Sequence, residues 1–351
     1  MSVQTGPGRR HGGPRNAPPR ELRPTGLRRT DKARAVVPLT LTGAVPEHPL
    51  VDDNLSKVLV WNGRTNQRWG TCGPCCCANS AIQARKYLLA SDISMSDAQI
   101  FDLYQRSGNP SFDPATGAGD DGVDMTVMLA ELVRNGMTVT KADGVETGVI
   151  RPLLFARVPF PPYDNLHALT AIFGGAALAV DLDQVQDVQT DAGLWDYVPG
   201  SPSWGGHAVW GGAYTSALEV HSLDESLVTW MQRCGTTPGF LNHQLAEVYV
   251  IVWPELWDHP GFTEGVDRAA LVADFEAITG RAWTGPDPGP PPPVPVPPPA
   301  PVPPGLDAAT ETYLRDPFLM AWARRRHTGA RDGNLYAARK FQALYEEEIP
   351  L

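Results

Sequence analysis

The 351-residue sequence has few cysteines and no long apolar run. Its five cysteines are an odd number, and four of them fall between Cys72 and Cys77. A disulfide framework spreads its cysteines along a secreted chain, so this clustering argues against one and indicates a reducing compartment. No apolar run reaches the ~20 residues of a membrane-spanning helix, and the first residues lack the apolar stretch of a signal peptide. We therefore expect a protein without a membrane span that is not secreted through a signal peptide.

Acidic residues are scarce at the start of the chain and abundant elsewhere. Residues 1–34 contain nine Arg or Lys and two acidic residues (+7), whereas the remainder contains 20 basic and 37 acidic residues (−17). A basic, Pro- and Gly-rich segment with so few apolar residues cannot fold alone. We interpret residues 1–50 as a flexible basic arm. Its first 34 residues are either solvated or bind an acidic surface or nucleic acid, although no aromatic side chain lies among the arginines to stack on bases.

The order of the predicted elements indicates an α+β fold over residues 51–284. Helical spacing of apolar residues, a strand-like run and alternating apolar runs favour the following elements. Helices are predicted at 78–90, 98–106, 124–135 and 165–173, and strands at 57–61, 176–182, 207–214, 218–222, 227–231 and 247–252. Residues 35–41 are an edge strand or an extended segment, because Pro38 excludes a central strand. Helices thus dominate the first half and antiparallel strands the second, which predicts two lobes.

The C-terminal part has a different composition. Thirteen prolines lie between Pro286 and Pro304, so residues 285–305 are predicted to form a polyproline II linker of roughly 60 Å at ~3.1 Å per residue. Residues 306–351 contain two amphipathic helical patterns. A module of this size has a marginal core, so we expect it to dock on a protein partner or to self-associate.

The cysteine-rich stretch from Asn66 to Asn79 is the strongest candidate for a chemical site. Cys72 comes directly before a predicted helix, and the Gly73-Pro74 pair suits the turn into its first residues;. Unpaired N–H groups and the helix dipole favour a thiolate at such a position. The pattern is typical of a nucleophilic cysteine, and it would require a base and an oxyanion donor nearby.

His207 is the best candidate for that base among eight histidines. Gly205, Gly206 and Ala208 surround it and would allow another part of the backbone to approach closely, and a strand pattern follows at once. A side-chain amide upstream of the cysteines would complete the site, and Asn66 and Gln67 lie six and five residues before Cys72. We therefore expect Cys72 to attack, His207 to carry the proton, and Asn66 or Gln67 to stabilise the oxyanion.

These motifs together resemble the papain-like cysteine peptidases. Gln67, Cys72-Gly73-Pro74-Cys75 and His207-Ala208-Val209 with Tyr214 match, in order, the glutamine, the cysteine element and the histidine strand of that family. The chain looks closer still to a divergent papain-like group found in phages and prophages of GC-rich bacteria. The stretches that carry this second resemblance are Asn66–Cys72, Asp113–Gly117, Gly205–His207, Val228–Trp230 and Glu247–Tyr249. The resemblance covers about residues 54 to 255 and implies a two-lobe papain-like fold that cleaves peptide bonds.

Two departures from the family pattern leave alternatives open. In papain itself the second cysteine of Cys-Gly-x-Cys attacks, which would be Cys75, whereas the spacing from Asn66 favours Cys72. The asparagine that usually orients the histidine is absent, and either Thr229 or Asp224 is expected to take that role. The resemblance implies a peptide or protein substrate, peptidoglycan peptides included, and no cofactor.

Other functions compete with the peptidase interpretation. Cys72-Gly73-Pro74-Cys75 equals a thioredoxin-type redox tetrapeptide, but the tryptophan lies two residues too early and a polar loop precedes the motif. A zinc site is disfavoured because adjacent cysteines cannot all point at one tetrahedral ion. A third alternative is a phage virion structural or adaptor protein with a papain-like body, attached through residues 306–351. We accordingly expect a location in the cytoplasm of a host cell or in a virion.

Overall fold

The computed structural model describes residues 23–28, 36–39, 41, 51–158, 166–215 and 220–289. The predicted helical module at 306–351 lies outside the described residues, as does the predicted linker at 285–305 apart from its first five residues. Within the described part of the chain, no helix has both the length and the apolar character needed to cross a membrane.

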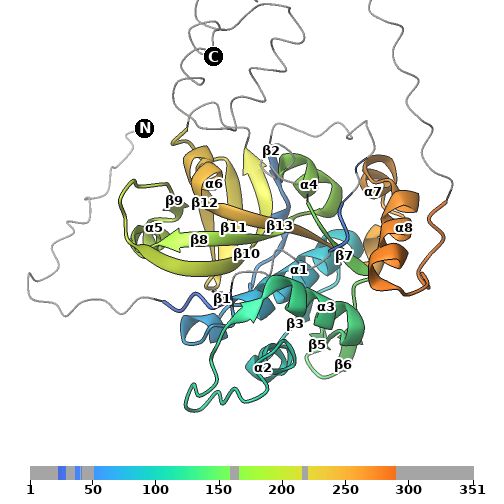
Figure 1. Ribbon diagram of the computed structural model, residues 1–351, viewed down its shortest axis with the longest axis horizontal. Helices are drawn as coiled ribbons and strands as arrows, with labels where there is room; N and C mark the ends of the chain where they lie inside the picture. The colour runs from blue at the N-terminus through green and yellow to red at the C-terminus, as the bar shows by residue number, and fades with distance from the viewer. Residues whose placement is uncertain are drawn as a thin grey trace, which may run out of the picture.

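Helices dominate the first half of the described chain (Figure 1). A long helix, α1, passes through the middle of the molecule, and shorter helices and a small sheet pack around it. These elements are η1 (Asn54–Lys57), η2 (Thr65–Gln67), α1 (Cys72–Leu89), β3 (Ile93–Ser94), α2 (Asp97–Arg106), β4 (Val123–Asp124), α3 (Met125–Asn135), β5 (Met137–Lys141) and β6 (Thr147–Ile150). Strands β3, β5 and β6 form a three-stranded antiparallel sheet.

The second half supplies most of the large sheet. Its main strand order is β7-β13-β8-β10-β11-β12-β9, antiparallel throughout except for the β12–β9 pair. The strands are β7 (Leu154–Arg157), β8 (Ala176–Asp183), β9 (Leu194–Trp195), β10 (Ser203–Thr215), β11 (Glu225–Thr229), β12 (Gln232–Thr236) and β13 (Leu245–Val252). The helices of this half are α4 (Leu166–Phe173), α5 (Val185–Ala192), α6 (Pro238–Gln244), η4 (Pro254–Leu256), α7 (Pro260–Gly265) and α8 (Arg268–Thr279).

The predicted α+β class is confirmed, as is the order of a helical part followed by an antiparallel sheet. The helices predicted at 98–106, 124–135 and 165–173 correspond to α2, α3 and α4. The strand predicted at 57–61 is wrong, since η1 and an irregular segment occupy those residues. The run at 218–222 is not the central strand of a meander, because residues 220–222 form a turn. Instead, β11 pairs directly with β10 on one side and β12 on the other.

Parts of the predicted flexible arm pack against the body. Strand β1 (Leu27–Arg28) pairs antiparallel with β10 and parallel with β4, and it lies between the large sheet and the helices (Figure 1). Strand β2 (Val51–Asp53) joins the other end of β10. Val37 and Leu39 are buried, and Leu39 donates its backbone N–H to the Arg157 carbonyl. The interpretation of residues 1–50 as a flexible basic arm is therefore corrected for Leu27, Arg28, Val37 and Leu39.

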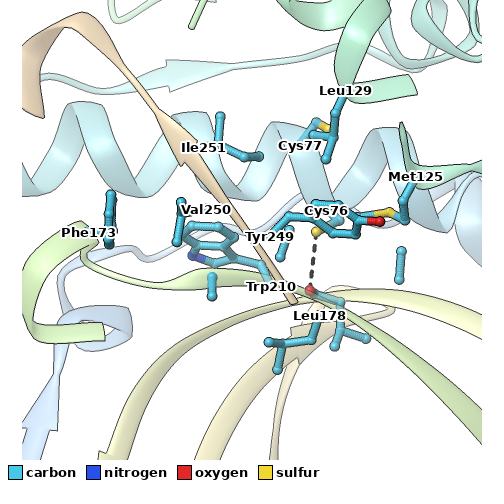
Figure 2. Packing of buried hydrophobic residues seen from close by; sticks show 14 of the residues in the cluster. Cys76, Cys77, Met125, Leu129, Phe173, Leu178, Trp210, Tyr249, Val250 and Ile251 are labelled. Carbon is cyan, nitrogen blue, oxygen red and sulfur yellow. Dashed lines mark hydrogen bonds between the residues drawn. The ribbon is translucent and has the colours of Figure 1, made fainter. Parts of the chain in front are cut away.

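Helix α1 connects the two halves because its first part is buried on every side. All residues from Cys72 to Ala84 are buried, which is typical of a helix inside a core;. Figure 2 shows Cys76 and Cys77 within this core, with Leu129 of α3 on one side and Trp210 of β10 on another. Pro74 is tolerated in the first turn, where its missing N–H would have no intrahelical partner.

Gly212 of β10 leaves room for the side chains of Gln83 and Leu55. A Cβ at Gly212 would lie 2.6 Å from Gln83 Oε1 of α1 and 2.8 Å from Leu55 Cδ2. We expect Gly212→Ala to lower the free energy of unfolding by about 2 kcal/mol, within the range for overpacked cores, measured by urea denaturation. Gly148→Ala in β6 is the matched control, because its Cβ would have only Lys141 Cε nearby, at 3.9 Å. Equal stability of the two variants would contradict the packing argument.

Candidate active site

The helical geometry of α1 sends the four clustered cysteines to different neighbours. Cys75 Sγ lies 3.3 Å from Thr65 Oγ1, Cys76 Sγ donates to the Val209 carbonyl at 3.2 Å, and Cys77 Sγ is 3.9 Å from Met128 Sδ. The Cys76 bond is the dashed line in Figure 2. All are free thiols. In the described residues no group of three or more His, Cys, Asp or Glu side chains is arranged to hold a metal ion.

Cys72 lies at the start of α1, opposite the residue that follows His207 on β10. The backbone N–H groups of Ala208 and of Gly73, in the first turn of α1, act to lower the pKa of its thiol. These donors favour the thiolate, as expected at a helix N-terminus. Burial outweighs them and raises the pKa of Cys72 to about 12. With the site buried, Cys72 is therefore a neutral thiol near pH 7, and it lies next to Ala208.

His207 is fully buried on β10, between two partners. Its Nε2 lies 2.7 Å from Thr229 Oγ1, and its Nδ1 lies 3.3 Å from the Thr25 carbonyl oxygen. Burial lowers the pKa of His207 to about 3, so the ring is neutral near pH 7. A carbonyl can only accept, so Nδ1 carries the single ring proton and donates it to Thr25. Nε2 then accepts from the Thr229 hydroxyl.

The turn that follows Thr229 covers the histidine. Trp230 stacks on the His207 ring with centroids 4.3 Å apart, and Trp195 meets the same ring edge-on. Trp230 and Met231 both have positive φ, in the tight turn between β11 and β12. Gln67 donates its Nε2 to the Trp230 carbonyl at 2.9 Å. Gln67 thus ties the cysteine loop to this turn, and its amide is directed to Trp230.

Asn66 is the amide that lies in the site. Its Nδ2 donates to the Trp69 carbonyl at 2.9 Å and points to the Pro24 carbonyl at 3.4 Å. The loop that carries it is held by Asp120, whose carboxylate accepts from the Gly70 backbone N–H at 3.0 Å and from the Tyr104 hydroxyl at 2.6 Å. Of the two amides predicted for the oxyanion, Asn66 faces the Pro24 carbonyl of residues 23–28, whereas Gln67 is bonded to the Trp230 carbonyl in the turn between β11 and β12.

Asp224 does not orient His207. Its Oδ1 lies 2.7 Å from Nε2 of His167, a residue of α4 whose ring stacks on Tyr214. The carboxylate therefore belongs to a different histidine. Of the two candidates for the orienting role, the structure brings only Thr229 to His207.

Residues 23–28 lie across the site, and Leu27–Arg28 form strand β1 within this segment. Besides the Pro24 and Thr25 carbonyls, the Gly26 carbonyl accepts from the Val123 backbone N–H at 2.8 Å, and Leu27 pairs with Gly206. The fit is close, since a Cβ at Gly26 would lie 2.3 Å from Gly70 Cα. A peptide main chain thus fills a groove whose walls are β10 on one side and the cysteine loop with β4 on the other.

Several of these contacts have no signal in the sequence. Thr25 and Gly26 lie in the stretch predicted to be a flexible basic arm, and Asp120 lies in a polar, Gly-rich loop. Trp230 belongs to the Val228–Trp230 stretch that carries the family resemblance, so the sequence indicated a place near His207, although it did not indicate ring stacking. The contacts of Asp120 with Gly70, Gln67 with Trp230 and Thr25 with His207 join residues 50, 163 and 182 positions apart. No local sequence pattern indicates contacts over such separations.

Comparisons with known proteins give structural similarities only. No protein-family model and no curated protein matches the sequence. Among solved structures, the chain is similar to xylellain, a cysteine protease from Xylella fastidiosa, with 14% identity and a TM-score of 0.48 over 67% of this chain and 98% of that one. A procathepsin B from Trypanosoma congolense has 12% identity and a TM-score of 0.44, covering 66% and 86%. The cysteine protease CMS1MS2 of Carica candamarcensis has 13% identity and a TM-score of 0.42, covering 59% and 99%.

The protonation state of His207 is testable by nitrogen NMR of the full chain. We expect His207 to remain neutral, with its proton on Nδ1, from pH 8 down to about pH 4.5, because burial lowers its pKa to about 3. Comparison with His207→Gln assigns the signals. A proton on Nε2, or a charged ring already present at pH 6, would contradict the geometry described above.

Proposed function

We propose that this protein hydrolyses peptide bonds, with Cys72 as the nucleophile and His207 as its base. The observation that carries the proposal is the arrangement around one groove. Cys72 begins α1 with its sulfur at the Ala208 N–H, His207 precedes Ala208, and Asn66 faces a peptide carbonyl in the same groove. A peptide main chain already fits that groove, which favours peptides as the substrate class.

The reaction follows from the residues in place. The thiol proton of Cys72 moves to Nδ1 of His207 as the sulfur attacks the scissile carbonyl carbon. The Asn66 amide and the Cys72 backbone N–H donate to the oxygen that becomes negative. As the carbon–nitrogen bond breaks, the imidazolium returns its proton to the leaving amine. Water then attacks the thioester, with His207 as base, and releases the acid and the thiol.

Residues 23–28 must leave the groove before this reaction can occur. The Thr25 carbonyl fixes the His207 proton on Nδ1, the nitrogen that must accept the proton of the thiol. Once the proton is on Nε2 instead, the Thr229 hydroxyl can rotate and accept a hydrogen bond from Nε2–H, because a hydroxyl both donates and accepts hydrogen bonds. Displacement of the segment and a change of tautomer are thus one step, which prepares the base.

Nucleophile variants test the proposal on a fluorescently labelled, unfolded protein substrate such as casein. We expect Cys72→Ser to lower kcat/KM by about a thousandfold or more, as for removal of a covalent nucleophile. Cys75→Ser is the matched control, because Cys75 lies one turn further along α1 among Thr65, Thr71 and Asn62, and it should retain activity within about tenfold.

Asn66→Ala separates the oxyanion role from a purely structural one. We expect kcat to fall by about a hundredfold or more while KM changes little, because the amide acts in the transition state.

Full activity of Cys72→Ser, or no cleavage by the unaltered chain over a broad peptide library, would overturn the proposed hydrolysis.

A further inference from the structure

The segment in the groove is anchored by one side chain at its N-terminal end. Arg23 donates from Nη1 to Asp187 Oδ1 at 2.7 Å and to the Asp187 carbonyl at 3.0 Å, and from Nη2 to Asp191 Oδ1 at 2.6 Å. Its guanidinium carbon also lies 5.5 Å from the centroid of the Trp230 ring. Three kinds of contact therefore converge on one guanidinium: charge-assisted hydrogen bonds to two carboxylates, a main-chain acceptor and an aromatic face.

The surroundings of Arg23 form a pocket rather than a surface ion pair. The Arg23 side chain is 16% exposed and that of Asp187 only 2%. Burying a carboxylate is costly unless a cation accompanies it. Asp187 and Asp191 are also four residues apart on α5, where two like charges on one helix face repel. Removing the guanidinium takes away a cation that these two carboxylates share, so a second arginine should be drawn to the same place.

We propose that Asp187, Asp191 and Trp230 form an arginine-binding subsite of the groove, which Arg23 fills in cis and an arginine of a substrate peptide fills in trans. The inference rests on the proposed function in one respect, namely that the groove is where substrate binds. The subsite selects a peptide whose arginine lies two residues before the carbonyl that contacts His207, as Arg23 does relative to Thr25.

Arginine fits this site better than lysine does. The planar fork of the guanidinium places Nη1 and Nη2 on different carboxylates at once, and its face can lie over an indole. An ammonium group is a compact point charge that cannot span both carboxylates and stack as well. The subsite therefore distinguishes arginine from lysine, and also from the neutral isostere citrulline.

The subsite links substrate preference to control of the thiol. Pro24 and Thr25 follow Arg23 directly, so the anchor at Asp187 and Asp191 holds their carbonyls at Asn66 and His207. Weakening the anchor should open the groove and expose Cys72. A peptide that carries the same arginine should close it again. Both effects are visible in the reactivity of the thiol, whether or not a peptide bond is cleaved.

The first test measures alkylation of Cys72 by iodoacetamide in the full chain at pH 7.5, quantified by peptide mass spectrometry. Arg23→Ala should raise the rate at least about tenfold, and Arg23→Lys should give an intermediate increase. Arg28→Ala is the matched control, because Arg28 is exposed on the same segment, and its rate should stay within about twofold of the unaltered chain. An unchanged rate in Arg23→Ala would overturn the proposal.

A double-mutant comparison shows whether Arg23 acts through the proposed subsite. The side chain of Asp191 is 52% exposed, so Asp191→Asn should leave the fold intact. It should raise the alkylation rate by severalfold, and its effect should largely disappear in the Arg23→Ala background. Fully additive effects of the two substitutions would contradict a shared site.

The second test uses a synthetic hexapeptide with the sequence of residues 23–28 and the Arg23→Ala chain. The peptide should slow the alkylation of Cys72 in a saturable manner, whereas the peptide with citrulline in the first position should protect at least about tenfold less well. Equal protection by the two peptides would overturn the subsite. Failure of the proposed hydrolysis would appear separately, as no cleavage of any peptide despite arginine-dependent protection of Cys72.

Discussion

The contact between α1 and β10 is the interaction on which the rest of the molecule depends. One turn of α1 after another meets β10, through Cys72 at Ala208, Cys76 at Val209 and Gln83 at Trp210. Further along β10, Gly212 leaves room for the side chain of Gln83 of α1. Because the helix comes from the first half of the chain and the strand from the second, this contact joins the two halves and places Cys72 opposite Ala208, the residue after His207.

The same contact explains why only one of the four clustered cysteines is suited to chemistry. Successive residues of a helix point in directions about 100° apart, so Cys75, Cys76 and Cys77 turn toward Thr65, Val209 and Met128. They are small apolar side chains that fill the space around α1. Cys72 alone sits at the helix start, where N–H groups are available to stabilise a thiolate.

Local patterns in the sequence supplied the candidates for part of this site. A thiol before a helix and a histidine among glycines predicted Cys72 and His207, and the short strand after them offered Thr229. The structure places all three around one groove, whereas Asp224 faces His167 instead. The choice between Thr229 and Asp224 depended on strand register. Residues 218–222 were expected to form a strand, whereas residues 220–222 form a turn and Asp224 lies directly before β11.

The occupied groove could not be predicted, because composition describes what a segment does alone and not what it binds. Residues 23–28 are too polar and too short to fold by themselves. They are ordered here by hydrogen bonds to backbone and side chains far along the chain, and by a charge match between a basic arm and an acidic body. Within the same chain, Arg23 thus contacts the acidic residues Asp187 and Asp191, and binding of the arm to a separate acidic partner stays a prediction.

Thr229 is the polar contact of His207 that does not depend on residues 23–28. A hydroxyl serves either tautomer. With the segment in place it donates to Nε2 while Nδ1 donates to Thr25, and with the segment absent it can accept from Nε2 while Nδ1 faces the thiol. A histidine that alternates between a covered and an open groove is therefore matched by a hydroxyl, which changes role by rotation about one bond.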